Sequence, residues 1–161
     1  STCGLVPGIR RLSREGLQVV LAVSLHAPND DLRNHIMPIN RRYNLTQLME
    51  ACREYVEATN RRITFEYALM QGFNDSPEHA RQLAQLIKGI LCHVNLIPLN
   101  PVDGHGWTSP TKRQVLLFQE ELARHNIEAT VRAARGADIE AACGQLKSRL
   151  GGKEVGHEHS S

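Results

Sequence analysis

The stretch LQVVLAVSL at residues 17–25 decides the fold class of this chain. It is short, rich in β-branched residues and almost continuously apolar, which is typical of a parallel strand buried on both faces. Three later short apolar stretches are of the same kind, at residues 63–69, 92–98 and 127–133. The sequence therefore predicts four strands.

Helical patterns separate these strands. Pro7 and Gly16 mark the ends of a short helix, and Asn44 is a good cap for a helix with an apolar stripe at 45–59. Further helices are predicted at 78–90 and 110–125, one or two turns at 30–36, and a last short helix at 138–150. Strands that alternate with helices indicate parallel βα units. We therefore predict an α/β fold, part of a βα barrel or of an open parallel sheet, with the helices on one side.

Length and composition are those of an ordinary globular domain. A compact fold of 161 residues buries roughly 70% of the surface that its unfolded chain exposes. The chain is 41% hydrophobic and 22% charged, and it has neither an apolar run long enough for a membrane span nor the pattern of a secretory signal. We predict one unit over residues 1–150, a disordered tail at 151–161 and a cytoplasmic location.

The four cysteines, at positions 3, 52, 92 and 143, are widely spaced. None of them forms the close pairs that bind zinc or iron–sulfur clusters, so the sequence offers no convincing metal site. A chain with enough apolar residues for a core and no export signal is not expected to form disulfides. We predict reduced thiols.

Arginine supplies 15 of the 19 basic residues, although the net charge is only +2. Guanidinium groups suit phosphates and base edges better than ammonium groups do. Solvated surface arginines explain the same bias equally well. Composition therefore leaves RNA binding open.

Polar residues collect at the predicted C-terminal ends of the strands, where parallel α/β proteins bind their ligands. They are Ser24, His26, Glu66, Asn95, Asn100, Arg132 and Arg135. Each one alone has a structural explanation, since Ser24 and Asn95 could satisfy buried backbone groups and Glu66 could pair with an arginine. Together they favour a binding rim.

Cys143 lies between Ala142 and Gly144, with Ala141 one residue further upstream. These small neighbours would let a bulky substrate approach the sulfur closely. A small buried cysteine on a helix has the same pattern. Spacing alone leaves both interpretations open.

Six strings occur in order along the chain: STCGLVP at 1–7, SLHAPNDDLR at 24–33, MPIN at 37–40, NRRITFEY at 60–67, NLIPLNP at 95–101 and RGADIEAACGQL at 135–146. Any one of them is a weak signal. Together, from residue 1 to about residue 150, they resemble the second half of the bacterial radical S-adenosylmethionine (SAM) methyltransferases that act on carbon 2 of adenine in 23S rRNA and tRNA. The resemblance implies the C-terminal portion of a radical SAM partial (βα) barrel with parallel strands.

The resemblance also implies roles for individual residues. The positions that match SAM contacts of the family are Ser1, Ser24, Leu25, His26 and Asn100. Cys143 matches the cysteine that one SAM methylates; a radical from a second SAM then takes hydrogen from that methyl group, and the resulting carbon radical adds to carbon 2 of the adenine. This route does not require the electron-poor carbon 2 to act as a nucleophile, but its first step needs a thiolate at Cys143.

Three family features precede the part that matches Ser1: the CxxxCxxC motif for the [4Fe-4S] cluster, a SAM motif with glycine and glutamate, and the cysteine that resolves the protein–RNA adduct. We therefore expect a fragment that is inactive alone, with SAM and the [4Fe-4S] cluster as cofactors of the complete enzyme. The resemblance further implies 23S rRNA and tRNA as partners, an electron donor such as flavodoxin, a monomer and no membrane.

Two other classes stay open on the residues alone. A noncatalytic RNA-binding α/β module would use the pairs Arg41-Arg42 and Arg61-Arg62 as phosphate contacts. A βα-barrel aldolase or isomerase usually has a lysine at a strand end or a paired acid and base, and none of the four lysines lies on a predicted strand. A CxxxCxxC motif upstream would distinguish the enzyme from both.

Overall fold

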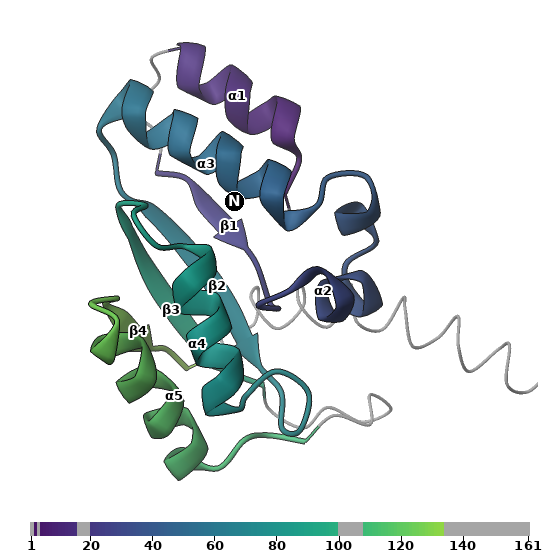
Figure 1. Cartoon of the computed structure of the whole chain (residues 1–161), viewed down its shortest axis with the longest axis vertical. Coiled ribbons are helices and arrows are strands. Elements are labelled where there is room, and N and C mark those ends of the chain that lie inside the picture. The colour runs from purple at the N-terminus through teal and green to yellow at the C-terminus, as the bar shows by residue number, and fades with distance from the viewer. Residues whose placement is uncertain (1, 3, 16–19, 100–107, 134–161) are drawn as a thin grey trace, which may run out of the picture.

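The computed structural model describes residues 2, 4–15, 20–99 and 108–133. Its elements follow in the order α1 (Val6–Glu15), β1 (Ala22–Ser24), α2 (Asp30–Ile36), the 3₁₀ helix η1 (Pro38–Arg41), α3 (Leu45–Thr59), β2 (Ile63–Leu69), α4 (Pro77–Leu86), β3 (Cys92–Pro98), α5 (Lys112–Arg124) and β4 (Ala129–Val131). The strands form one parallel sheet in the order β1-β2-β3-β4 (Figure 1). The predicted parallel α/β fold is confirmed.

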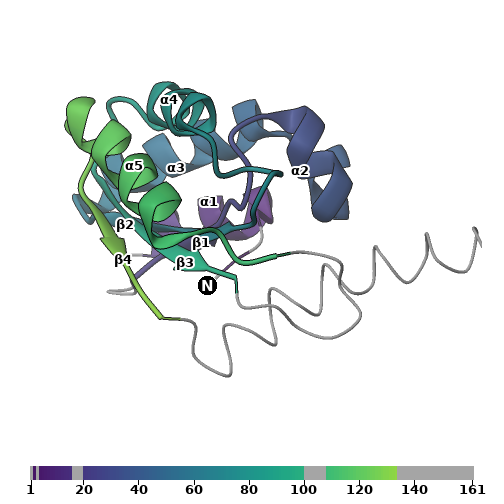
Figure 2. The ribbon, with the colours of Figure 1, turned by 90° about the horizontal axis from the view of Figure 1, so that it is seen from below.

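The helices α3, α4 and α5 lie on the same side of the sheet, as Figure 2 shows. A sheet covered by helices on one side is expected to have one apolar face and one more polar face, and β2 has both. In β2, Ile63, Phe65 and Tyr67 are fully buried, whereas Thr64 and Glu66 between them are only partly buried. Successive side chains of a strand point to opposite faces, so the apolar set packs under the helices and the polar set occupies the other face.

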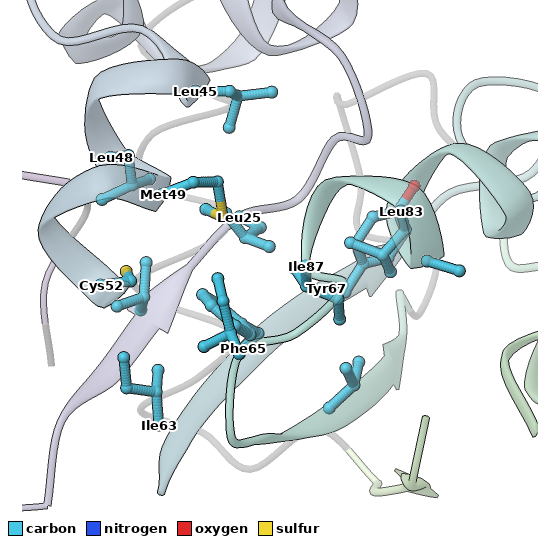
Figure 3. Packing of buried hydrophobic residues seen from close by; sticks show 14 of the residues in the cluster. Leu25, Leu45, Leu48, Met49, Cys52, Ile63, Phe65, Tyr67, Leu83 and Ile87 are labelled. Carbon is cyan, nitrogen blue, oxygen red and sulfur yellow. The ribbon is translucent and has the colours of Figure 1, made fainter. Parts of the chain in front are cut away.

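The core lies between the sheet and these helices. Phe65 on the second strand belongs to one buried cluster with Leu48 and Cys52 of α3 and with Leu83 of α4 (Figure 3). Further along the sheet, the ring of Phe118 on α5 lies 5.2 Å from the ring of Tyr67, measured between centroids. The aromatic side chains of β2 thus contact the helices on the covered side of the sheet.

The first strand differs from the prediction. Residues 17–19 lie outside the described residues, Val20 is 68% exposed, and the strand spans only Ala22–Ser24. The prediction that this whole stretch is buried on both faces is wrong. The described helices cover only one face of the sheet, and the neighbouring strand begins at Ile63, level with Leu21, so pairing does not extend back to Val20.

Two other elements are shorter than predicted. The fourth strand spans Ala129–Val131 rather than 127–133. The helix α4 spans Pro77–Leu86 rather than 78–90, and the chain then turns through Gly89, which has a φ of +82°. This backbone conformation strongly favours glycine and is incompatible with continuing the helix.

The helix α5 begins at Lys112 rather than at residue 110. Thr111 caps it, because its hydroxyl accepts a hydrogen bond from the backbone N–H three residues later. The helix predicted at 138–150 and the tail predicted at 151–161 lie outside the described residues.

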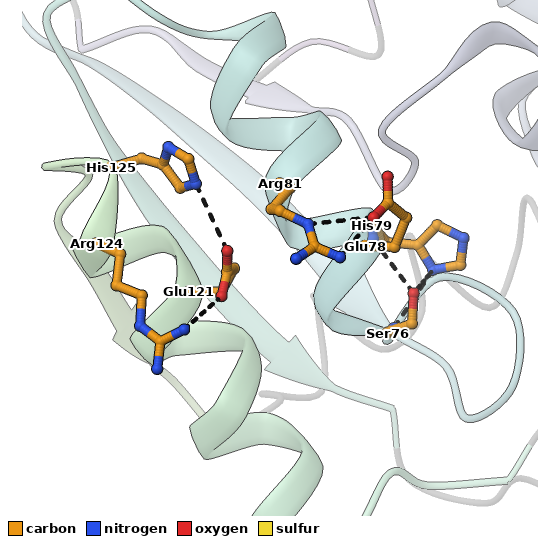
Figure 4. A network of polar contacts seen from close by, with 7 residues as sticks. All are labelled: Ser76, Glu78, His79, Arg81, Glu121, Arg124 and His125. Atoms are coloured by element: carbon orange, nitrogen blue, oxygen red, sulfur yellow. Dashed lines mark hydrogen bonds and ion pairs between the residues drawn. The ribbon is translucent and has the colours of Figure 1, made fainter.

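Short-range polar contacts stabilise the helices on the covered side of the sheet (Figure 4). At the start of α4, the Ser76 hydroxyl accepts a hydrogen bond from the backbone N–H of His79, and the His79 ring in turn accepts one from the Ser76 N–H. The figure also shows the pairs Glu78–Arg81, Glu121–Arg124 and Glu121–His125. The exposed pair Glu78–Arg81 contributes only about 0–1 kcal/mol, whereas Glu121 is 8% exposed and is held by both of its partners. We regard these residues as structural and place the candidate site on the other face.

Candidate ligand-binding site at the strand ends

A row of polar side chains crosses the face of the sheet that the described helices leave uncovered. Ser24 is level with Glu66, Glu66 with Asn95, and Asn95 with Thr130. Partners in parallel register point to the same face of the sheet. Arg132, just beyond β4, reaches back across this row, and its guanidinium lies 3.5 Å from the Glu66 carboxylate. The arginine partner predicted for Glu66 is thus present, and polar residues of four strands share one face.

The structure describes three of the six predicted site residues. Ser24 ends β1, and Leu25 and His26 follow it directly. Ser1, Asn100 and Cys143 lie outside the described residues. The convergence of all these residues on one cleft therefore stays a prediction.

Ser24 and Leu25 have different chemical capacities. The Ser24 N–H donates to the Thr2 carbonyl at 2.9 Å and its carbonyl accepts from Arg33 at 3.0 Å, but its hydroxyl makes no hydrogen bond to any described residue. The side chain of Leu25 is fully buried in the core, its N–H donates to the Glu66 carbonyl, and its own carbonyl accepts from Arg33. Ser24 can thus offer a hydroxyl to a ligand, whereas Leu25 can offer only backbone surface.

His26 is held in one protonation state. Its Nδ1 accepts a hydrogen bond from the Ala68 N–H at 2.9 Å, and the residue is 7% exposed. Burial, with a smaller contribution from the positive charge of Arg33, lowers the pKa of His26 from 6.5 to about 4. The ring is therefore neutral at physiological pH, and because Nδ1 is an acceptor, the proton resides on Nε2. His26 can present one N–H donor to a ligand at the end of β1.

This protonation state predicts an acid-sensitive fold. Since the pKa of His26 is about 4 in the folded state and 6.5 in an ordinary environment, the unfolded chain binds a proton more readily at intermediate pH. The stabilisation is complete above pH 6.5 and is lost as the pH falls toward 4, by about 3 kcal/mol. Urea denaturation at pH 7.5 and 4.5 should show a smaller pH dependence for His26→Asn than for wild type.

His35→Asn is the matched control, because His35 is an exposed histidine on α2. Comparing the two variants separates the effect of the buried His26 ring from the effect of removing a histidine as such. Equal pH dependence in His26→Asn and wild type would contradict the assignment of a neutral buried ring.

Arg33 of α2 is fully buried beneath the end of β1. Its Nε donates to the Leu25 carbonyl at 3.1 Å, one terminal nitrogen donates to the Ser24 carbonyl, and the other donates to Oδ1 of Asn40 at 2.9 Å. A Cβ placed on Gly4 would lie 3.3 Å from the same guanidinium. The side chain therefore touches the segment before α1, the end of β1 and η1 at once.

Asn74 holds the same region from the loop after β2. It is fully buried in the loop after β2, and its Nδ2 donates to the carbonyls of His26 at 2.9 Å and Ala68 at 2.7 Å. Its Oδ1 accepts from the Met70 N–H, and its carbonyl accepts from the Tyr67 hydroxyl. Both ends of this side-chain amide are thus engaged within the site region.

Sequence reasoning missed Arg33 and Asn74 as contributors to the site. The sequence placed Arg33 in the one or two helical turns predicted at 30–36 and Asn74 between the strand and the helix predicted at 63–69 and 78–90, without a site role for either. One signal was present, because Arg33 lies three residues before the apolar Ile36 and so falls on the buried side of α2.

The two described cysteines are free thiols without a site role. Burial raises the pKa of the Cys52 thiol to about 12 and that of Cys92 to about 11. A thiol with such a pKa has almost no thiolate at neutral pH and is a poor nucleophile. Cys52 and Cys92 therefore fit a role in packing and not one in chemistry.

An apolar groove of about 560 Å³ lies at the other edge of the sheet, between α5 and the ends of β3 and β4. Pro98, Val115, Leu116 and Val131 are among its lining residues, and none of the three described site residues, Ser24, Leu25 and His26, is. Within the described part of the chain, no three His, Cys, Asp or Glu side chains are grouped so that they could hold a metal ion. No described helix is long and apolar enough to cross a membrane.

Comparison with solved structures defines the class of this fold. A radical SAM methyltransferase from Sphaerobacter thermophilus superposes with a TM-score of 0.83 and 56% identity, covering 89% of this chain and 42% of that protein. A domain of pyruvate-formate lyase-activating enzyme from Bacteroides vulgatus shares the fold alone, with a TM-score of 0.59 and 13% identity over 80% of this chain and 89% of that domain. The chain thus has the fold of part of a radical SAM methyltransferase.

Curated relatives narrow this class. Proteins named probable dual-specificity RNA methyltransferase RlmN are 60% identical over 151 residues in Pelotomaculum thermopropionicum and 55% identical over 153 residues in Desulforamulus reducens. These matches cover 93% and 95% of this chain but only 41% and 44% of the relatives, so the chain spans about two fifths of their length. No protein-family model matches the chain. The resemblance to radical SAM dual-specificity RNA methyltransferases is confirmed.

Proposed function

We propose that this chain is part of a radical SAM enzyme that transfers a methyl-derived carbon from SAM to carbon 2 of an adenine in 23S rRNA and tRNA. The observation that carries the proposal is the 55–60% identity, over more than nine tenths of the chain, to proteins named dual-specificity RNA methyltransferase RlmN. The likeness to a solved radical SAM methyltransferase at 56% identity supports the same class.

The described strand ends fit a SAM site. SAM carries hydroxyl, carboxylate, amino and ring-nitrogen groups, which need both donors and acceptors. Ser24 supplies a hydroxyl without a partner among the described residues, and His26 supplies a neutral Nε2–H. Ser1, the backbone of Leu25 and Asn100 complete the proposed contacts. When bound, SAM supplies the methyl group and, with electrons from the [4Fe-4S] cluster, the radical.

The cluster ligands are proposed to lie in the part of the relatives that this chain does not match. Among the described residues, no three His, Cys, Asp or Glu side chains are grouped so that they could hold a metal ion, and Cys52 and Cys92 are free thiols. In the complete enzyme, an electron donor such as flavodoxin reduces the cluster, and the enzyme acts as a monomer in the cytoplasm. The chain alone is inactive on this proposal.

Cys143 is the proposed catalytic residue of this chain. Its thiolate accepts a methyl group, and the thioether then holds the carbon that is delivered to the adenine. Holding this carbon near the base is a positioning task that can contribute several kcal/mol to a rate enhancement. The small residues on either side of Cys143 leave room for a base to approach.

The test uses the complete polypeptide that contains this chain, with its cluster reconstituted. Incubation with methyl-labelled SAM, a reductant and either a 23S rRNA fragment or tRNA should yield labelled 2-methyladenosine, detected by mass spectrometry of digested RNA. Label at carbon 8 would overturn the proposed regiochemistry. RNA binding without SAM binding would instead favour the noncatalytic RNA-binding module.

A further inference from the structure

The sheet ladder is interrupted where the proposed SAM site begins. The Leu25 N–H donates to the Glu66 carbonyl, as in a regular parallel ladder, whose next bond would join the Ala68 N–H to the Leu25 carbonyl. Instead, the Ala68 N–H donates to the His26 ring, and the Leu25 carbonyl accepts from Arg33. His26 itself adopts a φ of +58°, in the left-handed region. Hydrogen bonds to side chains therefore replace the backbone hydrogen bond of the ladder at this point.

Three consecutive carbonyls are held by side chains from two different elements. Arg33 binds the carbonyls of Ser24 and Leu25 from α2, and Asn74 binds the carbonyl of His26 from the loop after β2. The carbonyls point into the protein at their partners. Side chains from outside the sheet thus help to fix the direction of the backbone from Ser24 to His26, in addition to the Leu25–Glu66 hydrogen bond of the ladder.

We propose that Arg33 and Asn74 are positioning residues for the SAM site, which fix the segment Ser24 to His26 so that the Ser24 hydroxyl and the His26 Nε2–H are presented to the ligand. This inference rests on the proposed function. Neither side chain needs to touch the ligand, because both act through the backbone that carries the contacting groups.

The chemistry of the two side chains suits this role. A buried guanidinium is costly unless its donors are satisfied, and its planar fork can hold two carbonyls in a fixed relation. Lysine has one donor centre and cannot reproduce that geometry. For Asn74, the amide donates two hydrogen bonds and accepts one, whereas a carboxylate of the same shape cannot donate. Arg33→Met therefore removes every donor of the guanidinium, whereas Arg33→Lys keeps one donor centre. Asn74→Asp removes the two donors of the amide.

The experiment measures SAM affinity in the complete, cluster-reconstituted polypeptide without RNA, by isothermal titration calorimetry. Asn74→Asp and Arg33→Met should raise the Kd for SAM at least about tenfold. Metal sites give the comparison, because mutating a group that only positions a metal ligand lowers the affinity for the metal by at least about tenfold. Arg33→Lys should show an intermediate Kd. The KM for SAM should rise in parallel, while kcat at saturating SAM falls less.

Two exposed residues provide matched controls. Arg53→Met and Asn60→Asp make the same chemical changes on α3 and at its C-terminal end, away from the strand ends, and should bind SAM with wild-type affinity. Circular dichroism and cluster content identify the variants that fold. If Arg33→Met does not fold, Arg33→Lys and Asn74→Asp decide the question.

Wild-type SAM affinity in folded Asn74→Asp and Arg33→Lys would overturn the positioning role and leave the proposed function intact. Loss of SAM affinity that is equal in the controls would overturn it as well, because the effect would then not be specific to the clamped segment. If wild type itself binds no SAM, the proposed function fails and this inference fails with it.

Discussion

Replacing Cys143 by alanine in the complete polypeptide is expected to abolish adenine methylation and to leave the fold intact. No atom of the alanine side chain can accept and then release the methyl-derived carbon, so the loss should be total rather than partial. The structural cost should be small, about 1 kcal/mol or less, because the residue is flanked by alanine and glycine and only one small group is deleted. Mass spectrometry of the protein after incubation with SAM should find one added methyl group on the wild-type Cys143 peptide.

Cys52→Ala is the matched control for this variant. The Cys52 thiol is fully buried in the core, and burial raises its pKa to about 12, so it should take no part in the chemistry. Its loss should lower the stability and leave methylation at the wild-type level. Methylation retained in Cys143→Ala would disprove the role of Cys143.

Phe65→Ala should lower the free energy of unfolding by about 3–5 kcal/mol, far more than the loss of a buried thiol. Phe65 has no exposed surface, lies on an inner strand, and packs against both α3 and α4 (Figure 3). Deleting its ring leaves a cavity between two helices that are anchored to the sheet and cannot close over it. The free energy of unfolding is measured by urea denaturation.

Leu116→Ala is the control for Phe65→Ala. Leu116 is a large apolar residue of α5 but is 53% exposed, and its truncation should cost no more than about 0.5 kcal/mol. Similar losses in the two variants would contradict the assignment of the core to the space between the sheet and the helices.

The inner strands were predictable from the sequence, and the outer ones less so. The structure gives β2 and β3 the predicted bounds, because each has a strand on both sides and the two pair with each other along their whole length. At the outer strands β1 and β4, the number of paired residues depends on where the neighbouring strand begins and ends. β1 and β4 pair over three residues each, and apolar composition alone does not reveal this limit.

The candidate site was predictable where it depends on position along a strand. Ser24 and His26 could be placed because residues at strand ends share one edge of a parallel sheet. Arg33 and Asn74 could not be assigned, because their role depends on side chains that reach across eight and 48 residues of sequence to backbone carbonyls. Neither a periodic pattern nor a local motif carries that information.

The imidazole of His26 has a consequence for the geometry of the whole rim. Because the ring accepts the hydrogen bond of the Ala68 N–H, that N–H cannot continue the backbone ladder between β1 and β2. An aliphatic residue with ordinary backbone angles at this position would free that N–H for the Leu25 carbonyl. Each residue by which the strand then grew would carry the start of the following loop about 3.3 Å further along the sheet. The side chains of His26 and Arg33 together thus limit how far β1 extends along the sheet at this point.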